Sequence, residues 1–356
     1  MKKILSLFTA ASLAVGALSA CGTASAPAAP ENDNLEIVTT IFPEYDWVKN
    51  ILGDKASDVD LTLLLDNGVD LHSYQPTAED ILKISTCDLF IYVGGESDDW
   101  VEDALENAVN KDMVVLNLLD ILGESVKEEE IVEGMQEEAH DHDHEGEDHE
   151  DGDADHEDGD EDHDDSGEAE EHDHEEGPEY DEHVWLSLRN AEILVNAISK
   201  ALCDIDAAGA DAYTANAEAY TEKLKALDEA YAAAVAEAPV TTLLFGDRFP
   251  FRYMVDDYGL SYYAAFAGCS AETEASFETV TFLAGKVDEL SLHSVMTIEG
   301  SDHKIADTII ANTASKDQQI LALDSLQSVT QADIDGGADY LSSMESNLEV
   351  LKEALK

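Results

Sequence analysis

A long segment rich in histidine and acidic residues divides this chain into two unequal parts. From about Ala139 to Leu188 it reads AHDHDHEGEDHEDGDADHEDGDEDHDDSGEAEEHDHEEGPEYDEHVWLSL, with no Lys or Arg and almost no apolar side chain before Val184. A segment of this composition cannot bury a hydrophobic core. The folded structure must therefore be built from the residues on either side. We expect 128–182 to form an acidic, His-rich disordered loop between two folded regions.

The histidines of this segment indicate metal binding. Neutral imidazole and carboxylate are the nitrogen and oxygen donors that divalent cations use, and their density predicts many weak, auxiliary metal sites. The alternative interpretation is a purely solvated acidic spacer. The histidines inside the segment are His140, His142, His144, His149, His156, His163, His172 and His174. His183 lies at the edge of the segment, where an ordinary globular pattern resumes, so it is not one of these auxiliary sites.

The N-terminus has the features of an export signal. Residues 1–20 begin with the basic Lys2 and Lys3 and continue as an apolar stretch that is shorter than the roughly 20 residues of a membrane-spanning helix. The following Cys21 completes a Leu-Ser-Ala-Cys-Gly sequence that looks like the lipobox of bacterial lipoproteins. We expect lipidation of Cys21, a flexible tether at 21–34, and an anchor on the outer face of the bacterial cell membrane. An ordinary signal peptide followed by a chance cysteine is the alternative.

Charge and length limit the classes of function. The formal net charge of −63 is extreme, but roughly 30 of the 81 acidic residues lie in 128–182, so the folded regions are only moderately acidic. A chain with this much negative charge is repelled by the phosphate backbone, so nucleic acid is excluded as a partner. Removal of residues 1–20 leaves about 335 residues, which is enough for two lobes.

The cysteines give no sign of a zinc finger. Apart from Cys21 the chain contains Cys87, Cys203 and Cys269, an odd number that allows at most one disulfide and leaves a free thiol. No Cys-x-x-Cys or Cys-His spacing occurs. We interpret all three as structural residues.

Residues 35–127 alternate strand-like and helix-like segments. Predicted strands cover 35–42, 59–65, 87–93 and 113–118, and predicted helices cover 45–52 and begin at 77 and 97. This βαβ pattern predicts a parallel sheet. Thr77 with Asp80 three residues later is the signature of a helix start, which places His72 in the loop between a strand and a helix.

The chain after the acidic segment is first helical and then alternating. Residues 183–238 have apolar positions at three- and four-residue steps, and 210–238 contain no Gly or Pro over about 29 residues, roughly 43 Å of helix. In 239–356 predicted strands cover 240–246, 294–299 and 319–324, with helices from 251, at 276–290, from 301 and at 338–355. The predicted fold class is α/β, with two lobes that are each a mainly parallel sheet flanked by helices, joined by a long rigid helix.

Four residues are candidates for one metal site. In open α/β sheets ligands bind beyond the carboxyl ends of the strands. His72, Asp247 and Asp324 each follow a predicted strand, and His183 precedes the linking helices. Each is a weak signal alone, because a loop His is usually a surface group and an Asp after a strand is often a cap or turn residue. Together, two imidazoles and two carboxylates satisfy a four-coordinate divalent ion.

At these residues the sequence resembles the zinc and manganese substrate-binding proteins of ABC transporters. The resemblance covers nearly the whole chain after the signal and includes the acidic His-rich insertion. It rests on the segments GVDLHSYQPTAED, DEHVWLSLRNA, ANAEAYTEKLKALDEAY, YGLSYYAAF, AETEAS, TIEGSDHKIA and LALDSL. It implies a rigid two-lobed fold that holds one metal between the lobes, no catalysis, and delivery of the ion to a membrane permease. It carries over to His72 and His183 and, at LALDSL, to Asp324.

The chain departs from the family pattern at the third ligand. The family usually has His or Glu in a short H/E-x-x-F-x-Y-F pattern, whereas this chain has GDRFPFRYMVDDYGL, which is one residue longer than that pattern. Asp247 is the nearest donor in that stretch. Glu299 and His303 are alternatives, although Glu299 occupies the place of a structural acid in the family and His303 has the pattern of a surface residue in a first helical turn.

We therefore predict an extracytoplasmic, metal-binding component of an ABC importer that captures Zn²⁺ between its lobes. The alternatives are a manganese-binding importer component, a surface metal buffer or adhesin, and a metallohydrolase. Manganese suits two hard carboxylates, but imidazole donors and the affinity order favour zinc. A hydrolase needs an open metal position beside a general base, and no nucleophile elbow, phosphate loop or HExxH helix occurs. The expected partners are an ABC permease and the membrane, and a monomer is expected.

Overall fold

The computed structural model describes residues 34–136, 179–270 and 274–356. The described residues between Leu35 and Lys356 form one compact unit. The predicted export signal, the lipidation site Cys21 and the histidines from His140 to His174 lie outside the described residues. The sequence predictions for these segments therefore stay predictions.

The N-terminal lobe contains a four-stranded parallel sheet in the order β2-β1-β3-β4. β1 pairs in register with β2 from Leu35 opposite Val59 to Thr39 opposite Leu63. The four predicted strands of this lobe are confirmed. Its strands are β1 (Leu35–Thr39), β2 (Val59–Leu63), β3 (Leu89–Tyr92) and β4 (Val114–Asn117), and its helices are α1 (Phe42–Leu52), α2 (Ala78–Thr86), α3 (Trp100–Glu106) and α4 (Leu118–Leu122).

The predicted start of α2 is also confirmed. The Thr77 hydroxyl accepts the Asp80 backbone N–H at 3.2 Å, and the Asp80 carboxylate accepts the Thr77 N–H at 2.9 Å. This reciprocal cap satisfies two backbone donors that the first helical turn leaves free. It ends the loop that carries His72.

The C-terminal lobe contains a second four-stranded parallel sheet in the order β6-β5-β7-β8. The sequence did not predict β6 as a strand, and this strand is therefore an addition to the predicted fold. The strands are β5 (Thr242–Phe249), β6 (Ser261–Ala267), β7 (Ser294–Ile298) and β8 (Gln319–Leu323), and the helices are α7 (Arg252–Tyr258), α8 (Phe277–Leu290), α9 (Lys304–Asn312), α10 (Gln331–Asp335) and α11 (Tyr340–Ala354).

β5 contains an irregularity in its pairing with β6. Phe245 pairs with Ala264 and Arg248 pairs with Phe266, so three steps along β5 match two steps along β6. One extra residue in a strand is the signature of a bulge, which redirects the side chains that follow it. Within the bulge, a Cβ added at Gly246 would lie 2.7 Å from the Ala306 Cα, so the close approach of α9 requires glycine.

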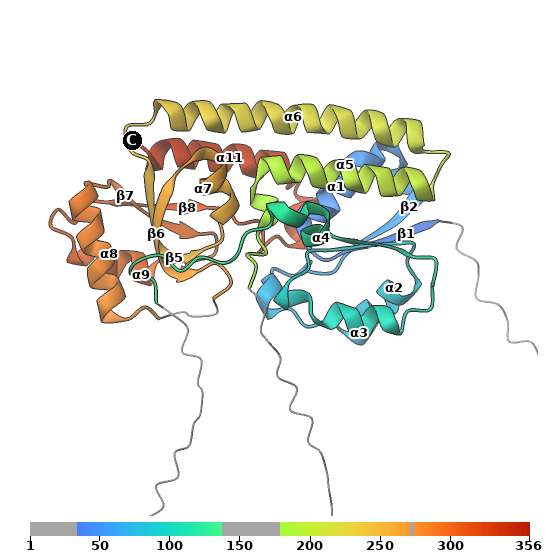
Figure 1. Ribbon diagram of the computed structural model, residues 1–356, viewed down its shortest axis with the longest axis horizontal. Helices are drawn as coiled ribbons and strands as arrows, with labels where there is room; N and C mark the ends of the chain where they lie inside the picture. Colours follow the sequence, from blue (N-terminus) through green and yellow to red (C-terminus); the bar gives the residue numbers. More distant parts are fainter. Residues whose placement is uncertain (1–33, 137–178, 271–273) are drawn as a thin grey trace, which may run out of the picture. The chain divides into compact units, whose positions relative to one another are not determined.

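Two long helices connect the lobes. α5 (Leu188–Ile205) and α6 (Ala210–Glu237) follow the acidic segment, and α6 contains 28 residues. α6 contacts α1 and α5 as well as α7 and α11, and Figure 1 shows it running past both sheets. The predicted long helix is confirmed, and its buried positions recur at three- and four-residue steps from Tyr213 to Val235.

One hydrophobic core extends through both lobes. It includes Ile37 and Phe90 of the first sheet, Leu224 of α6, and Phe245 of the second sheet. A smaller core lies around α8 and α9 against the second sheet. Because the main core continues from sheet to sheet, the linking helices are part of the packed interior.

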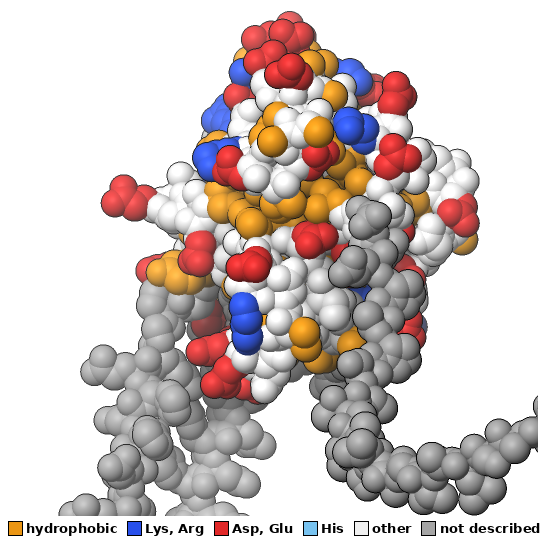
Figure 2. Space-filling view, turned by 90° about the vertical axis from the view of Figure 1, so that its right-hand side faces the viewer, with side chains coloured by type: hydrophobic (Ala, Val, Ile, Leu, Met, Phe, Trp, Pro, Cys, Tyr) orange, Lys and Arg blue, Asp and Glu red, His pale blue; other side chains and the backbone are white. Residues whose placement is uncertain are grey.

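One end of the described part of the chain carries mixed charge at its surface (Figure 2). Figure 2, which views the side that lies to the right in Figure 1, shows acidic and basic side chains interspersed around a band of hydrophobic surface. Within the residues that the structure describes, no helix is both long enough and apolar enough to cross a membrane.

Candidate metal centre

His72 lies in an anchored turn beyond the carboxyl end of β2. The chain forms a short 3-10 turn at Leu71–Ser73. The Asp70 carboxylate accepts a hydrogen bond from the His72 backbone N–H at 3.0 Å. The same loop is joined to the second lobe by an isolated antiparallel bridge between Asn67 and Thr330. These contacts fix the backbone from which the His72 imidazole projects.

His183 occupies the point where the chain enters the linking helices. Its backbone N–H donates to the Asp181 carboxylate at 2.9 Å. The 3-10 turn Val184–Leu186 follows and buries Trp185, whose indole N–H donates to the Ser325 carbonyl at 2.9 Å. His183 itself is 0% exposed. Its imidazole is therefore held between a carboxylate and a packed turn.

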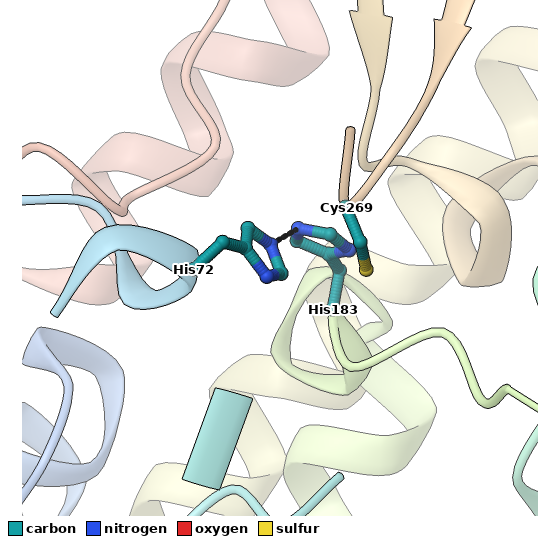
Figure 3. Close-up of side chains that lie close together, drawn as sticks. All are labelled: His72, His183 and Cys269. Carbon is teal, nitrogen blue, oxygen red and sulfur yellow. Dashed lines mark hydrogen bonds between the residues drawn. The ribbon is translucent and has the colours of Figure 1, made fainter. Parts of the chain in front are cut away.

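The two imidazoles face each other. Their Nε2 atoms lie 3.1 Å apart, and a dashed line joins the two rings in Figure 3. The His72 Nδ1 lies 2.8 Å from the Ser97 hydroxyl, and the His183 Nδ1 lies 3.0 Å from the Asp181 carboxylate. An oxygen partner on Nδ1 places the ring proton there and leaves Nε2 as the donor atom for a metal. Both free donor atoms then converge on one point.

Cys269 joins the two histidines from the C-terminal lobe. It follows β6 by two residues, and one donor atom from each of His72, His183 and Cys269 lies within 4.8 Å of the others. In Figure 3 the His183 ring lies between the other two side chains. The three residues come from the first lobe, the linking segment and the second lobe. The sequence predicts only a structural role for Cys269, because no local spacing links it to either histidine.

The electrostatics keep the imidazole of His72 neutral. Burial, and then the neighbouring His183, lower the pKa of His72 well below its ordinary value. Burial also raises the pKa of Glu182, whose carboxylate lies 3.4 Å from the His72 Nδ1. Burial raises the pKa of Asp70 as well, but the Arg248 guanidinium beside it outweighs burial and lowers that pKa overall. A neutral imidazole is the form that binds a cation.

Arg248 lies close to this group and is paired. Its guanidinium forms an ion pair with the Asp70 carboxylate, and both side chains are largely buried. The charge that would repel a cation next to His72 is therefore balanced by a carboxylate on the same turn.

The two predicted carboxylate ligands have other partners in the structure. Asp247 accepts the Arg248 backbone N–H at 3.0 Å and the Ile298 N–H at 3.4 Å. Asp324 accepts the Leu326 N–H at 2.8 Å. Among the described residues, neither belongs to the group that converges within 4.8 Å. Their role as ligands stays a prediction.

The two alternative ligands are also engaged elsewhere. Glu299 accepts the Ser325 backbone N–H at 2.7 Å and its hydroxyl at 2.6 Å. His303 is exposed, and its Nδ1 lies 3.4 Å from the Thr297 hydroxyl. Glu299 therefore fixes the turn after β8, while His303 stays at the surface.

The donor set fits a zinc ion. With zinc to nitrogen bonds of about 2.0 Å and tetrahedral angles, two nitrogens on one ion lie about 3.3 Å apart. The 3.1 Å between the two Nε2 atoms is close to that separation. A zinc-bound sulfur and nitrogen lie about 3.6 Å apart by the same geometry, and the Cys269 sulfur lies within 4.8 Å of one ring nitrogen of each histidine.

Comparison with known families assigns the chain. Residues 37–354 match the family described as "Zinc-uptake complex component A periplasmic". The chain belongs to this family. The match begins in β1 and ends in α11, so it includes both lobes and the linking helices. The two-lobed α/β fold predicted from the sequence is thereby confirmed.

Individual members of the zinc-uptake component A family are similar over nearly the whole chain. The zinc-binding lipoprotein AdcA of Streptococcus pneumoniae is 30% identical over 354 residues, which are 99% of this chain and 61% of that protein. The chain thus spans about three fifths of the length of these AdcA relatives. The high-affinity zinc uptake system protein ZnuA of Bacillus subtilis is 28% identical over 340 residues, 95% of this chain and 93% of that protein.

Solved structures of family members have the same architecture. The Zn(II)-bound ZnuA-like domain of Streptococcus pneumoniae AdcA has a TM-score of 0.64 and 26% identity, covering 90% of this chain and 99% of that domain. The metal-dependent lipoprotein YcdH of Bacillus subtilis has a TM-score of 0.66 and 24% identity, covering 90% of this chain and 99% of that one. The latter shows similarity of fold alone.

Proposed function

We propose that this chain is the extracytoplasmic, zinc-binding component of an ABC importer. The observation that carries the proposal is the pair of buried imidazoles whose Nε2 atoms lie 3.1 Å apart. Two neutral nitrogen donors held this way bind a borderline-soft cation such as zinc more strongly than they bind manganese. Relatives named for zinc binding and zinc uptake support the same cargo. The chain delivers the ion to a membrane permease and carries out no catalysis.

We propose His72, His183 and the carboxylate Asp324 as ligands of the ion, and Asp247 is the candidate that the sequence offers for the remaining position. Zinc is the cargo and not a resident cofactor, so binding must be tight and also reversible. The Nδ1 partners, Ser97 and Asp181, orient the two rings toward the ion. Orientation of this kind raises metal affinity because the ring does not have to be ordered when the ion arrives.

A zinc titration of histidine variants tests the proposal. We expect His72→Ala and His183→Ala to lose zinc affinity by orders of magnitude and to lose the zinc-dependent rise in melting temperature. His293→Ala is the matched control, because His293 is exposed on the second lobe and lies outside the converging group. If either site variant keeps the full rise, that residue is removed from the shell. If both keep it, the proposed site is wrong.

Membrane attachment and transport need cellular tests. We propose that Cys21 is lipidated and anchors the protein on the outer face of the cell membrane; the relatives named as lipoproteins support this. Cys21→Ala should release the protein into the medium or the soluble fraction. Zinc uptake should fall at limiting zinc in a strain lacking the chain, and unchanged uptake would contradict the importer role.

A further inference from the structure

We propose that Cys269 is a third protein ligand of the transported zinc ion and the residue that sets the preference of this site for zinc over manganese. The inference rests on the proposed zinc-binding function and concerns the third corner of the same site. The inference makes Cys269, two residues after β6, the ligand at the position that the sequence predicts for Asp247 in β5.

The backbone around Cys269 is pressed against His183. Gly268 allows this approach, because a Cβ at this position would lie 3.1 Å from the His183 Cε1 and 2.9 Å from the Phe249 carbonyl oxygen. Any other residue at 268 would have to displace the ring or the strand. The glycine therefore brings the next residue, Cys269, to the edge of the imidazole.

The backbone of Cys269 is held in that place by a residue that precedes the acidic segment. Its backbone N–H donates to the Glu129 carboxylate at 3.0 Å, and Glu129 in turn donates its N–H to the Glu179 carbonyl at 2.9 Å. Glu129 and Glu179 lie on either side of the 137–178 segment. The thiol is consequently positioned by residues that flank the acidic insertion, close to where His183 begins the linking segment.

The candidates in β5 are directed elsewhere. The bulge after Phe245 turns the Asp247 carboxylate to the Ile298 backbone N–H. The next side chain, Arg248, is a cation and pairs with Asp70. Neither residue offers a donor to the two Nε2 atoms in this arrangement. Among the described residues, the group that converges on the imidazole pair is completed by Cys269.

A thiolate changes the metal preference of the site. Sulfur is a soft donor that favours zinc and is a poor ligand for manganese, which prefers oxygen. A set of two imidazoles and one thiolate gives zinc three bonds of about 2.0 to 2.3 Å and leaves one tetrahedral position for a carboxylate or a water. On binding, the thiol proton is displaced by the metal and leaves to solvent, so no oxidant or reductant takes part.

Competitive zinc titration under reducing conditions provides the test. We expect Cys269→Ser to weaken zinc binding by about 10- to 100-fold or more, because loss of a direct ligand should cost at least as much as loss of a residue that orients one. The manganese affinity should change little, so the ratio of zinc affinity to manganese affinity should fall. Cys203→Ser is the matched control, since Cys203 is a partly buried free cysteine outside the converging group.

Cobalt substitution gives an independent readout. Cobalt bound to the wild-type protein should show a sulfur-to-metal charge-transfer band in the near ultraviolet, and this band should be absent in Cys269→Ser and present in Cys203→Ser. Cys269→Ala and a melting curve without metal check that the variants fold. If Cys269→Ser keeps both the zinc affinity and the charge-transfer band, Cys269 is not a ligand. That result overturns only this inference when His183→Ala still abolishes binding, whereas retained binding in His183→Ala overturns the proposed site itself.

Discussion

The guanidinium of Arg248, in β5 of the second lobe, forms an ion pair with Asp70, two residues before His72 in the first lobe. Asp70 also caps the turn that carries His72. One contact therefore joins the lobes and supports a proposed ligand at the same time.

This pair should be coupled energetically. Removal of one partner leaves a largely buried charge uncompensated, so Arg248→Gln and Asp70→Asn should each lower the free energy of unfolding by about 1–3 kcal/mol. The double variant should lose less than the sum, with a coupling of roughly 1–2 kcal/mol. Urea unfolding of the four proteins without metal measures the cycle. Additive losses would show that the pair contributes nothing beyond its separate residues.

The Ser97 side chain should contribute to the zinc affinity of the wild-type site although it does not contact the ion. Its hydroxyl lies 2.8 Å from the His72 Nδ1, and loss of such an orienting partner typically lowers metal affinity about 10- to 100-fold. We expect that range for Ser97→Ala in a competitive zinc titration. Ser73→Ala is the matched control because Ser73 is exposed on the same turn as His72. Equal affinities in the two variants would remove the hydroxyl from this role.

Gly268 should tolerate no side chain. Gly268→Ala would place a methyl group 2.9 Å from the Phe249 carbonyl and 3.1 Å from the His183 ring. We expect a loss of about 1–3 kcal/mol in the free energy of unfolding, together with weaker zinc binding. Gly285→Ala in α8 is the control, since nothing lies within 4 Å of its added Cβ, and it should be stabilising by about 0.5–1 kcal/mol. Thermal melts and zinc titrations of both variants report the two effects separately.

Glu44 should make the stability depend on pH. Burial raises the pKa of Glu44 to about 8, so between the unfolded pKa near 4.5 and the folded value the native state binds more protons than the unfolded state. Stability from this group is therefore full below the unfolded pKa and falls as the pH rises through the folded pKa. Urea unfolding from pH 5 to 8 should show this decline, by at most about 5 kcal/mol.

Glu44→Gln should flatten that profile because the amide does not ionise. Two other buried carboxyl groups act in the same direction, since burial raises the pKa of Asp46 to about 6 and of Asp98 to about 7. The difference between the pH profiles of the wild-type protein and Glu44→Gln gives the part of the pH dependence that Glu44 contributes. Parallel profiles for the two proteins would contradict the assignment.

The acidic His-rich segment should collect zinc at many weak sites. Deletion of 139–179 should leave one tight site and abolish several weak ones, with slower growth only when zinc is scarce. Protons compete for imidazole near its ordinary pKa of about 6.5, so weak binding should fall steeply between about pH 7 and 5.5. Equilibrium dialysis of the full-length and shortened proteins at both pH values measures this. Equal stoichiometry at neutral pH would mean that the segment is a solvated spacer.

The parts of the fold that the sequence predicted are those with local signals. The capping pair Thr77 and Asp80 marks the start of α2, and the uninterrupted apolar periodicity of 210–238 marks α6. β6 was not predicted, because SYYAAFA lacks an alternation of polar and apolar residues and three of its seven residues are Ala, which is depleted in strands.

The site was predictable only where a ligand has its own local context. His72 and His183 lie in segments that mark them, and the structure brings their imidazoles together. The proximity of Cys269 could not be predicted, because it depends on a long-range approach that Gly268 permits. The bulge in β5 is likewise a property of pairing with β6, and a sequence shows the extra residue without showing where Asp247 and Arg248 then point.

The shared core has a consequence for how cargo leaves the protein. Rotation of one sheet away from the other would pull apart side chains that pack continuously from Ile37 through α6 to Phe245, and exposing apolar area costs about 25 cal/mol for each Å². A wide hinge opening is therefore expensive for this molecule. In the proposed importer role, unloading should instead proceed by movement of the short turn at Leu71–Ser73, which buries the Leu71 side chain and is anchored by the ion pair between Asp70 and Arg248. The rate of zinc release would then depend on the movement of Leu71–Ser73 and not on the movement of whole lobes.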